Sequence, residues 1–283
     1  MGNYYCIVSG LPDVAFDGSK VHYSVERFRD EIYPQLTSDD TRLVALFFLS
    51  RDNANILQML EYGGDAPLKK VGVYKGERLA EIIASAKDGD IRDIKVPAYI
   101  YDFLDFYFAN EEKEGYVWSD ILSAHYYEYA MSVSNKFLSG WFEYNLNVNN
   151  ILVALLARKY KLNVSESVVG NNAVSEALRT SNARDFGLSG SVDYFEALVR
   201  LNEDERLHER ERRLDEMRWA WLEDNSVFNY FTVEKLYVFL QKLDIIERWA
   251  IMDADKGMEQ YNSMIEDLKS GAVFTDAINN ENK

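Results

Sequence analysis

Apolar residues recur at intervals of three or four along most of this chain, which is the spacing of one face of an α-helix. Val25, Phe28 and Ile32 show this spacing near the start, and the stretch at 118–144 continues it without a break. All four prolines lie within the first 97 residues, so nothing beyond them forbids long helices. The pattern predicts an all-α protein.

One segment departs from the helical pattern. The sequence "EYGGDAPLKKVGVYKG" at 61–76 contains several glycines and Pro67, which are typical of turns. Within it, "KKVGVY" has the composition of a short strand. We therefore expect a short strand pair near 66–76 inside an otherwise helical protein.

A motif of polar residues followed by an apolar run occurs twice. "SRDNANILQML" at 50–60 and "LNVNNILVALL" at 146–156 align with an offset of 95 residues. The alignment superimposes Asp52 on Asn147 and Asn55 on Asn150. An offset of about a third of the chain indicates repeated structural units that bury a face against one another.

A weaker third copy lies in "QKLDIIERWAIM", where Asp244 and Glu247 have the same three-residue spacing. Three helical repeats are therefore predicted, at 1–97, 98–189 and 190–283. Pro97 marks the first boundary, and the glycines of "RDFGLSGSVDYF" mark the second.

The spacing of the motif residues predicts a structural role. Residues three apart lie on one face of a helix, so Asp52 lies beside Asn55, and Asn147 beside Asn150. Amide and carboxylate side chains in such places bond to free backbone groups or to a neighbouring helix. General acid and base chemistry needs two titratable groups together, and the second copy has only amides.

Composition and charge narrow the classes of partner. The 283 residues are 47% hydrophobic and 28% charged, which is typical of a globular protein. The formal net charge of −16 disfavours nucleic acid and anionic lipid, which bind to clustered Lys and Arg. We expect partners to be basic or neutral where they touch this chain.

The cellular location follows from what the sequence lacks. Cys6 is the only cysteine, so no internal disulfide forms and a reducing compartment is expected. No apolar run approaches the roughly 20 residues of a membrane span, and the amino terminus has no positively charged flank. A cytoplasmic protein without membrane insertion is predicted.

Catalytic and metal motifs are incomplete. The sequence contains neither G-x-x-x-x-G-K-S/T nor G-x-G-x-x-G, the two glycine-rich loops that bind nucleotide phosphates. The histidines are His22, His125 and His208. Glu205 and His208 form one Glu-x-x-His motif, but a di-iron site in a helix bundle needs two such motifs, and the chain has no second one. We predict no catalytic, cofactor-binding or metal-binding residue, and a metal enzyme built on Glu205 and His208 remains the weaker alternative.

The stretch "WSDILSAHYYEYAMSVSNKFLSGWFEYNLNVNNILVALLARKY" resembles the C-type central-stalk protein of archaeal-type rotary ATPases, the equivalent of the d-type protein of eukaryotic V-ATPases. Tyr126 and Tyr127 match a Tyr-Tyr pattern of that family, and Asn150-Ile151 matches the step that follows it. The chain resembles still more closely an uncharacterised bacterial family encoded with V-type ATP synthase genes.

The resemblance implies a funnel of three similar helical domains and no catalytic residue. It also implies a coupling role in the central stalk, on the inner face of the cell membrane. The partners would be the membrane rotor ring and the two axle proteins of the ATPase, its D and F components, and the isolated chain would be a monomer. An all-helical adaptor unrelated to ATPases has the same composition and is the alternative.

Overall fold

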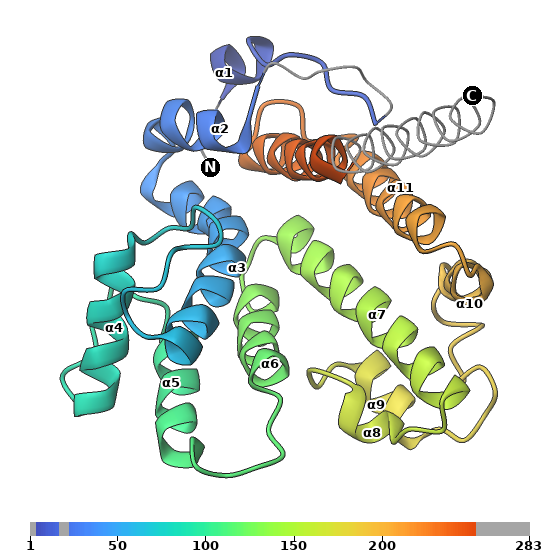
Figure 1. The fold of residues 1–283 in the computed structure, drawn as a ribbon. Coiled ribbons are helices and arrows are strands. Elements are labelled where there is room, and N and C mark those ends of the chain that lie inside the picture. The colour runs from blue at the N-terminus through green and yellow to red at the C-terminus, as the bar shows by residue number, and fades with distance from the viewer. Residues whose placement is uncertain (1–3, 17–22, 253–283) are drawn as a thin grey trace, which may run out of the picture.

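The computed structural model describes residues 4–16 and 23–252. Described residues form helices joined by turns and loops, without a β-strand, which confirms the all-α prediction (Figure 1). His22 and the last part of the third predicted repeat, 253–283, lie outside the described residues. The elements are α1 (Tyr5–Ser9), α2 (Val25–Glu31), η1 (Tyr33–Gln35), α3 (Ser38–Tyr62), α4 (Gly76–Asp88), α5 (Ala98–Asn110), α6 (Trp118–Met131), α7 (Lys136–Lys159), α8 (Val164–Ser167), α9 (Ala173–Thr180), α10 (Phe195–Glu203), α11 (Leu207–Asn225) and a helix at 233–252.

The strand pair expected near 66–76 was a wrong prediction. This segment is a loop between α3 and α4. Its backbone N–H groups at Lys69, Val73 and Tyr74 bond to side chains of α3 instead of to a second strand. A strand needs a partner for these groups, and here the side chains supply it.

The continuous apolar pattern at 118–144 is divided between two helices. α6 ends at Met131 and α7 begins at Lys136. Asn135 causes the break, because its side-chain oxygen accepts a hydrogen bond from the Leu138 N–H, at 3.1 Å, and caps α7. Its amide nitrogen donates to Glu234 on the 233–252 helix, at 2.7 Å. The cap therefore also ties the start of α7 to the last described helix.

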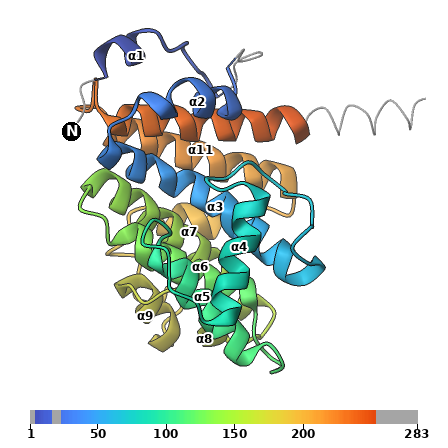
Figure 2. The same ribbon diagram turned by 90° about the vertical axis from the view of Figure 1, so that its left-hand side faces the viewer.

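The helices pack as a series of neighbours along the chain. α3, α4, α5 and α6 form one group, α7 carries α8, α9 and α10, and α11 packs against both α10 and α7. The two views show α1, α2 and the 233–252 helix at the end of the molecule opposite α8 and α9 (Figures 1 and 2).

Most buried apolar residues form one core that runs through these groups, and Trp219, Ile245 and Trp249 form a second, smaller cluster between α11 and the 233–252 helix. α4 packs on α5 across the predicted boundary at 97, and α7 packs on α10 across the boundary at 189. The division into three repeats stays a prediction. No helix within the described ranges has both the length and the apolar character needed to cross a membrane.

Candidate functional site

The first copy of the motif holds the 63–75 loop against α3. The Asn55 side-chain oxygen accepts from the Lys69 N–H at 2.8 Å, and its amide nitrogen donates to the Lys70 carbonyl at 2.8 Å. One turn earlier, the Asp52 carboxylate accepts from the Val73 N–H at 2.8 Å and, more weakly, from the Tyr74 N–H at 3.4 Å. These two side chains determine the path of a loop that has no regular structure of its own.

Asp52 is unusual because its carboxyl group is completely buried. Burial raises the pKa of Asp52 to about 7, while the hydrogen bonds from Val73 and Tyr74 act in the opposite direction. Gly72 makes this contact sterically feasible, since a Cβ atom at that position would overlap with the Asp52 carboxylate. The loop therefore needs a glycine for close approach, and the glycine at 72 has this structural explanation.

The second copy makes the same kind of contact with the segment that follows α7. The Asn150 side-chain oxygen accepts from the Val169 N–H at 3.0 Å, and its amide nitrogen donates to the Val169 carbonyl at 2.6 Å and to the Ser175 hydroxyl at 3.0 Å. Asn147 accepts from the Asn172 amide at 2.7 Å, and Asn172 in turn caps α9. Both copies, Asp52 with Asn55 and Asn147 with Asn150, thus fix the segment that follows their own helix.

The third copy bonds to segments that precede it in the chain. Glu247 accepts from the Val25 N–H, the first residue of α2, at 2.7 Å. Asp244 pairs with Arg51 at 2.6 Å, and Arg51 directly precedes Asp52 in the first copy. The 233–252 helix is therefore tied to the amino-terminal part of the molecule, and these contacts link the first and third copies.

The two tyrosines of the resemblance have different environments. Tyr126 is buried and donates its hydroxyl to the Leu46 carbonyl of α3 at 2.7 Å. Its ring packs edge-on against Phe142 at 5.6 Å between centroids. Tyr127 instead lines a groove, where its hydroxyl meets the Asn149 amide at 3.4 Å. Tyr126 is a core residue, and Tyr127 is a partly buried residue at the edge of the groove.

The structure brings Tyr127 and Asn150 together in this groove, which lies between α6 and the α7–α8 pair and has a volume of about 720 Å³. We call it the α6–α8 groove. Val117 and Val153 expose apolar surface along it. Its charged side chains are Asp120 and Glu166, and no Lys or Arg of the described ranges lines it. The groove is acidic with an apolar floor.

A second exposed surface lies at the turn between α11 and the 233–252 helix. Phe228 is 88% exposed there, although it is a large aromatic residue. The Tyr4 N–H donates to the Phe231 carbonyl at 2.9 Å, and the rings of Tyr5 and Phe231 lie 4.6 Å apart, so α1 extends this surface. We call it the aromatic surface, and its members are Tyr5, Val227, Phe228, Tyr230 and Phe231.

The sequence analysis missed the aromatic surface. The signal was present in "SVFNYFT" at 226–232, which has three aromatic residues and no charge between two helical segments. A connection between helices is normally polar, because it runs over the surface of the protein. An aromatic connection of this kind departs from that rule and makes this turn a candidate binding surface.

The residues proposed for a metal site are not assembled into one. Glu205 is exposed, whereas the His208 ring packs against Trp249 at 5.0 Å between centroids. The His208 Nε2 atom is buried and has no hydrogen-bond partner among the described residues. Within residues 4–16 and 23–252, no three His, Cys, Asp or Glu side chains converge as metal ligands.

Comparison with known proteins places the chain in a family. The family model described as "Protein of unknown function (DUF2764)" matches residues 1–272. No curated protein and no solved structure matches the chain.

The predicted membership in the C-type central-stalk family of rotary ATPases was wrong, because no ATP synthase family matches. The residues behind that resemblance have local explanations here. Tyr126 bonds to a backbone carbonyl inside the core, and Asn150 holds a loop. Hydrogen bonds of this kind between side chains and the backbone occur in helical proteins of many families, since buried backbone groups need hydrogen-bond partners. The family match covers almost the whole sequence, and the chain belongs to the DUF2764 family of proteins of unknown function.

Proposed function

We propose that this protein is a non-catalytic helical adaptor that binds one partner protein at the aromatic surface and another at the α6–α8 groove. The observation that carries the proposal is the placement of these two surfaces. The turn at 226–232 and the helix α8 lie at opposite ends of the molecule in both views (Figures 1 and 2). Two partners bound there would not compete for space.

The aromatic surface has the composition of a protein interface. Single exposed apolar residues are ordinary on protein surfaces, but a contiguous group of them marks an interaction site. Tyr and Phe side chains bury a large area on binding and are enriched at the centres of interfaces. Full burial of a side chain such as Phe228 would contribute about 1.5 to 3 kcal/mol to binding.

The groove favours a different kind of partner. Asp120 and Glu166 place negative charge beside the apolar side chains of Val117 and Val153. A helix with one apolar face and flanking Lys or Arg residues complements this arrangement. The net charge of −16 would speed the approach of such a partner, while the apolar contacts would supply most of the affinity.

A rigid body between two binding surfaces suits an adaptor. The continuous core joins the helical groups, and the motif residues of all three copies fix loops or helices to one another. Close-packed protein interiors have low compressibility, so a movement imposed at one surface would reach the other.

A central-stalk role in a rotary ATPase is the narrower form of this proposal. The two partners would then be the rotor ring and the D and F axle proteins, on the cytoplasmic face of the membrane. That role, and a monomeric state of the isolated chain, stay predictions. Identification of the partners tests them directly.

The experiment is site-specific photocrosslinking in living cells. Benzoylphenylalanine replaces Phe228 in one variant and Val153 in another, and the crosslinked proteins are identified by mass spectrometry. Glu77 on α4 and Glu205 before α11 are exposed positions outside both surfaces and provide the control variants.

We expect Phe228 and Val153 to capture two different proteins that neither control captures. Crosslinks to ring and axle proteins would support the central-stalk form, and two other proteins would support the general adaptor. Crosslinks that match those of the controls, or the same protein at both positions, would contradict the two-partner adaptor.

A further inference from the structure

A third feature is unrelated to the adaptor surfaces. A cleft of about 680 Å³ lies between α3, the 92–98 segment and the start of α5, and its volume is within the range of sites for small molecules. We call it the α3–α5 cleft. Four tyrosines line it, and they come from four different parts of the chain: Tyr33, Tyr74, Tyr101 and Tyr129.

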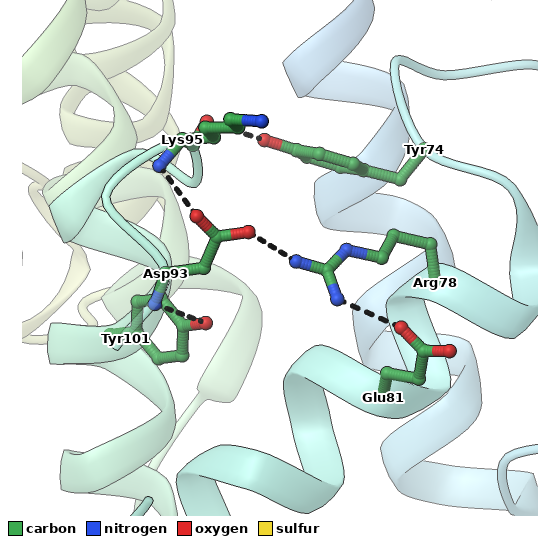
Figure 3. A network of polar contacts seen from close by, with 6 residues as sticks. All are labelled: Tyr74, Arg78, Glu81, Asp93, Lys95 and Tyr101. Carbon is green, nitrogen blue, oxygen red and sulfur yellow. Dashed lines mark hydrogen bonds and ion pairs between the residues drawn. The ribbon is translucent and has the colours of Figure 1, made fainter. Parts of the chain in front are cut away.

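One wall of the cleft is held in place by a polar network (Figure 3). The Asp93 carboxylate pairs with Arg78 of α4 and accepts from the Lys95 N–H at 2.9 Å. The Asp93 N–H donates to the Tyr101 hydroxyl at 3.2 Å. These contacts fix the backbone of the 92–95 segment from two helices, so the cleft exists before any ligand arrives.

Two of the tyrosines have hydroxyl groups available to a ligand. Neither Tyr33 nor Tyr129 has a hydroxyl hydrogen bond to another residue within the described ranges. A tyrosine hydroxyl keeps its proton at neutral pH, and burial raises the pKa of Tyr33 further, to about 12, so this hydroxyl is a donor. Two neutral donors on aromatic walls suit a flat molecule that carries an acceptor group.

The charges of the cleft are positive in a chain that is strongly negative overall. Arg42, Arg92 and Lys95 line it, and Asp93 is its only acidic lining residue within the described ranges. Arg92 is neutralised by two aspartates of α5, and Arg42 pairs with Asp39 at the surface. The Lys95 ammonium has no ion-pair partner among the described residues, and Figure 3 shows it on the side of Tyr74, away from the Asp93 carboxylate.

The rim of the cleft adds an apolar contact. Ile94 lines the cleft and is 97% exposed, and Ile91 in the same connection between α4 and α5 is equally exposed. Because Asp93 and Lys95 on either side of Ile94 are held by the polar network, the Ile94 side chain is presented at a fixed place. Burial of Ile94 against an apolar ligand would remove this surface from water.

We propose that the α3–α5 cleft binds a small aromatic molecule that carries an anionic group, a carboxylate or a phosphate. The aromatic body lies between the tyrosines and Ile94, and the anion lies beside the Lys95 ammonium and the guanidinium of Arg42. This site is independent of the adaptor proposal, since none of its residues belongs to the aromatic surface or to the α6–α8 groove.

A matched pair of fluorescent probes tests the proposal. 8-Anilinonaphthalene-1-sulfonate is an aromatic anion, and N-phenyl-1-naphthylamine has the same aromatic skeleton without the sulfonate. We expect saturable binding of the anion to the full chain at one site, with an affinity at least about tenfold higher than that of the neutral probe. Equal affinities for both probes would overturn the proposal.

Substitutions locate the binding site. Lys95→Glu reverses the unpaired charge and should weaken binding of the anionic probe about tenfold, with little change for the neutral probe. Lys87→Glu is the control, because Lys87 is an exposed lysine of α4 outside the cleft, and the substitution changes the net charge equally. Equal effects of the two substitutions would overturn the proposal.

Competition distinguishes the two classes of anion. Displacement of the anionic probe by millimolar benzoate identifies a carboxylate site, and displacement by millimolar phenyl phosphate identifies a phosphate site. Displacement by neither compound would mean that the probe binds elsewhere and would overturn the assignment.

Discussion

Replacement of Asp52 by asparagine should remove the contribution that ionisation of this buried carboxyl group makes to the pH dependence of the free energy of unfolding. Burial raises the pKa of Asp52 to about 7, whereas an aspartate in an unfolded chain titrates near 3.9. Between these two values the folded protein binds more protons than the unfolded chain, so the free energy of unfolding falls as the pH rises. A difference of about three pKa units corresponds to a loss of up to about 4 kcal/mol by neutral pH.

The second copy of the motif shows why asparagine is a suitable replacement. Asn147 occupies the position equivalent to Asp52, and its neutral amide is also buried. In Asp52→Asn, the amide oxygen can keep the 2.8 Å hydrogen bond from the Val73 N–H. The long contact with the Tyr74 N–H, at 3.4 Å, is lost, because the new amide NH2 group is itself a donor, and this adds a cost that does not depend on pH. The variant therefore removes the ionisable group with little change in packing.

The assay is urea unfolding of the parent and the variant between about pH 5 and about pH 8. We expect the stability of the parent relative to Asp52→Asn to fall by about 1.4 kcal/mol per pH unit up to pH 7 and to level off above it. Glu247, whose pKa burial also raises, contributes the same slope to both proteins and cancels. Parallel stability curves would refute the argument that Asp52 is desolvated.

Two further substitutions test the loop contacts. Asn150→Leu leaves the backbone groups of Val169 without their partner and should lower the free energy of unfolding by about 1 to 3 kcal/mol in urea, whereas Asn149→Leu at an exposed position should cost less. Equal midpoints for Asn150→Leu and the parent would contradict the structural role. Gly72→Ala places a methyl group against the Asp52 carboxylate and should lower the thermal midpoint of unfolding. Gly190→Ala places its methyl group in open space and should lower this midpoint much less. The reverse order would show that the loop does not approach Asp52 closely.

The helical class and the motif were both predictable from the sequence. The recurrence of apolar residues at three and four positions depends only on local geometry, so it identifies helices wherever one face is buried. The repeated Asn-Ile-Leu stretch identified the polar positions that recur at the same places in the two copies. Asparagine bonds readily to backbone groups, and this explains why a structural role was expected for Asn55 and Asn150 before their partners were known.

The partners of those residues were decided by the tertiary structure. A side chain on α3 replaces a strand neighbour for the 69–74 backbone, and no local pattern in "KKVGVY" shows that such a side chain lies beside it. The pKa of Asp52 has the same origin, because it depends on how much water the packed helices exclude from one carboxyl group.

The α3–α5 cleft and the aromatic surface also appear only in the assembled fold. The four tyrosines of the cleft are separated by up to 96 residues in sequence. They meet because α6 packs against both α3 and α5, η1 packs against α3, and Asp52 of α3 holds the loop that carries Tyr74. Local periodicity thus determined which segments are helical and which residues are polar within them. The contacts between distant segments determined which of those residues are buried, which are bonded and which remain exposed, because burial and hydrogen bonding depend on neighbours that the chain brings together only when it folds.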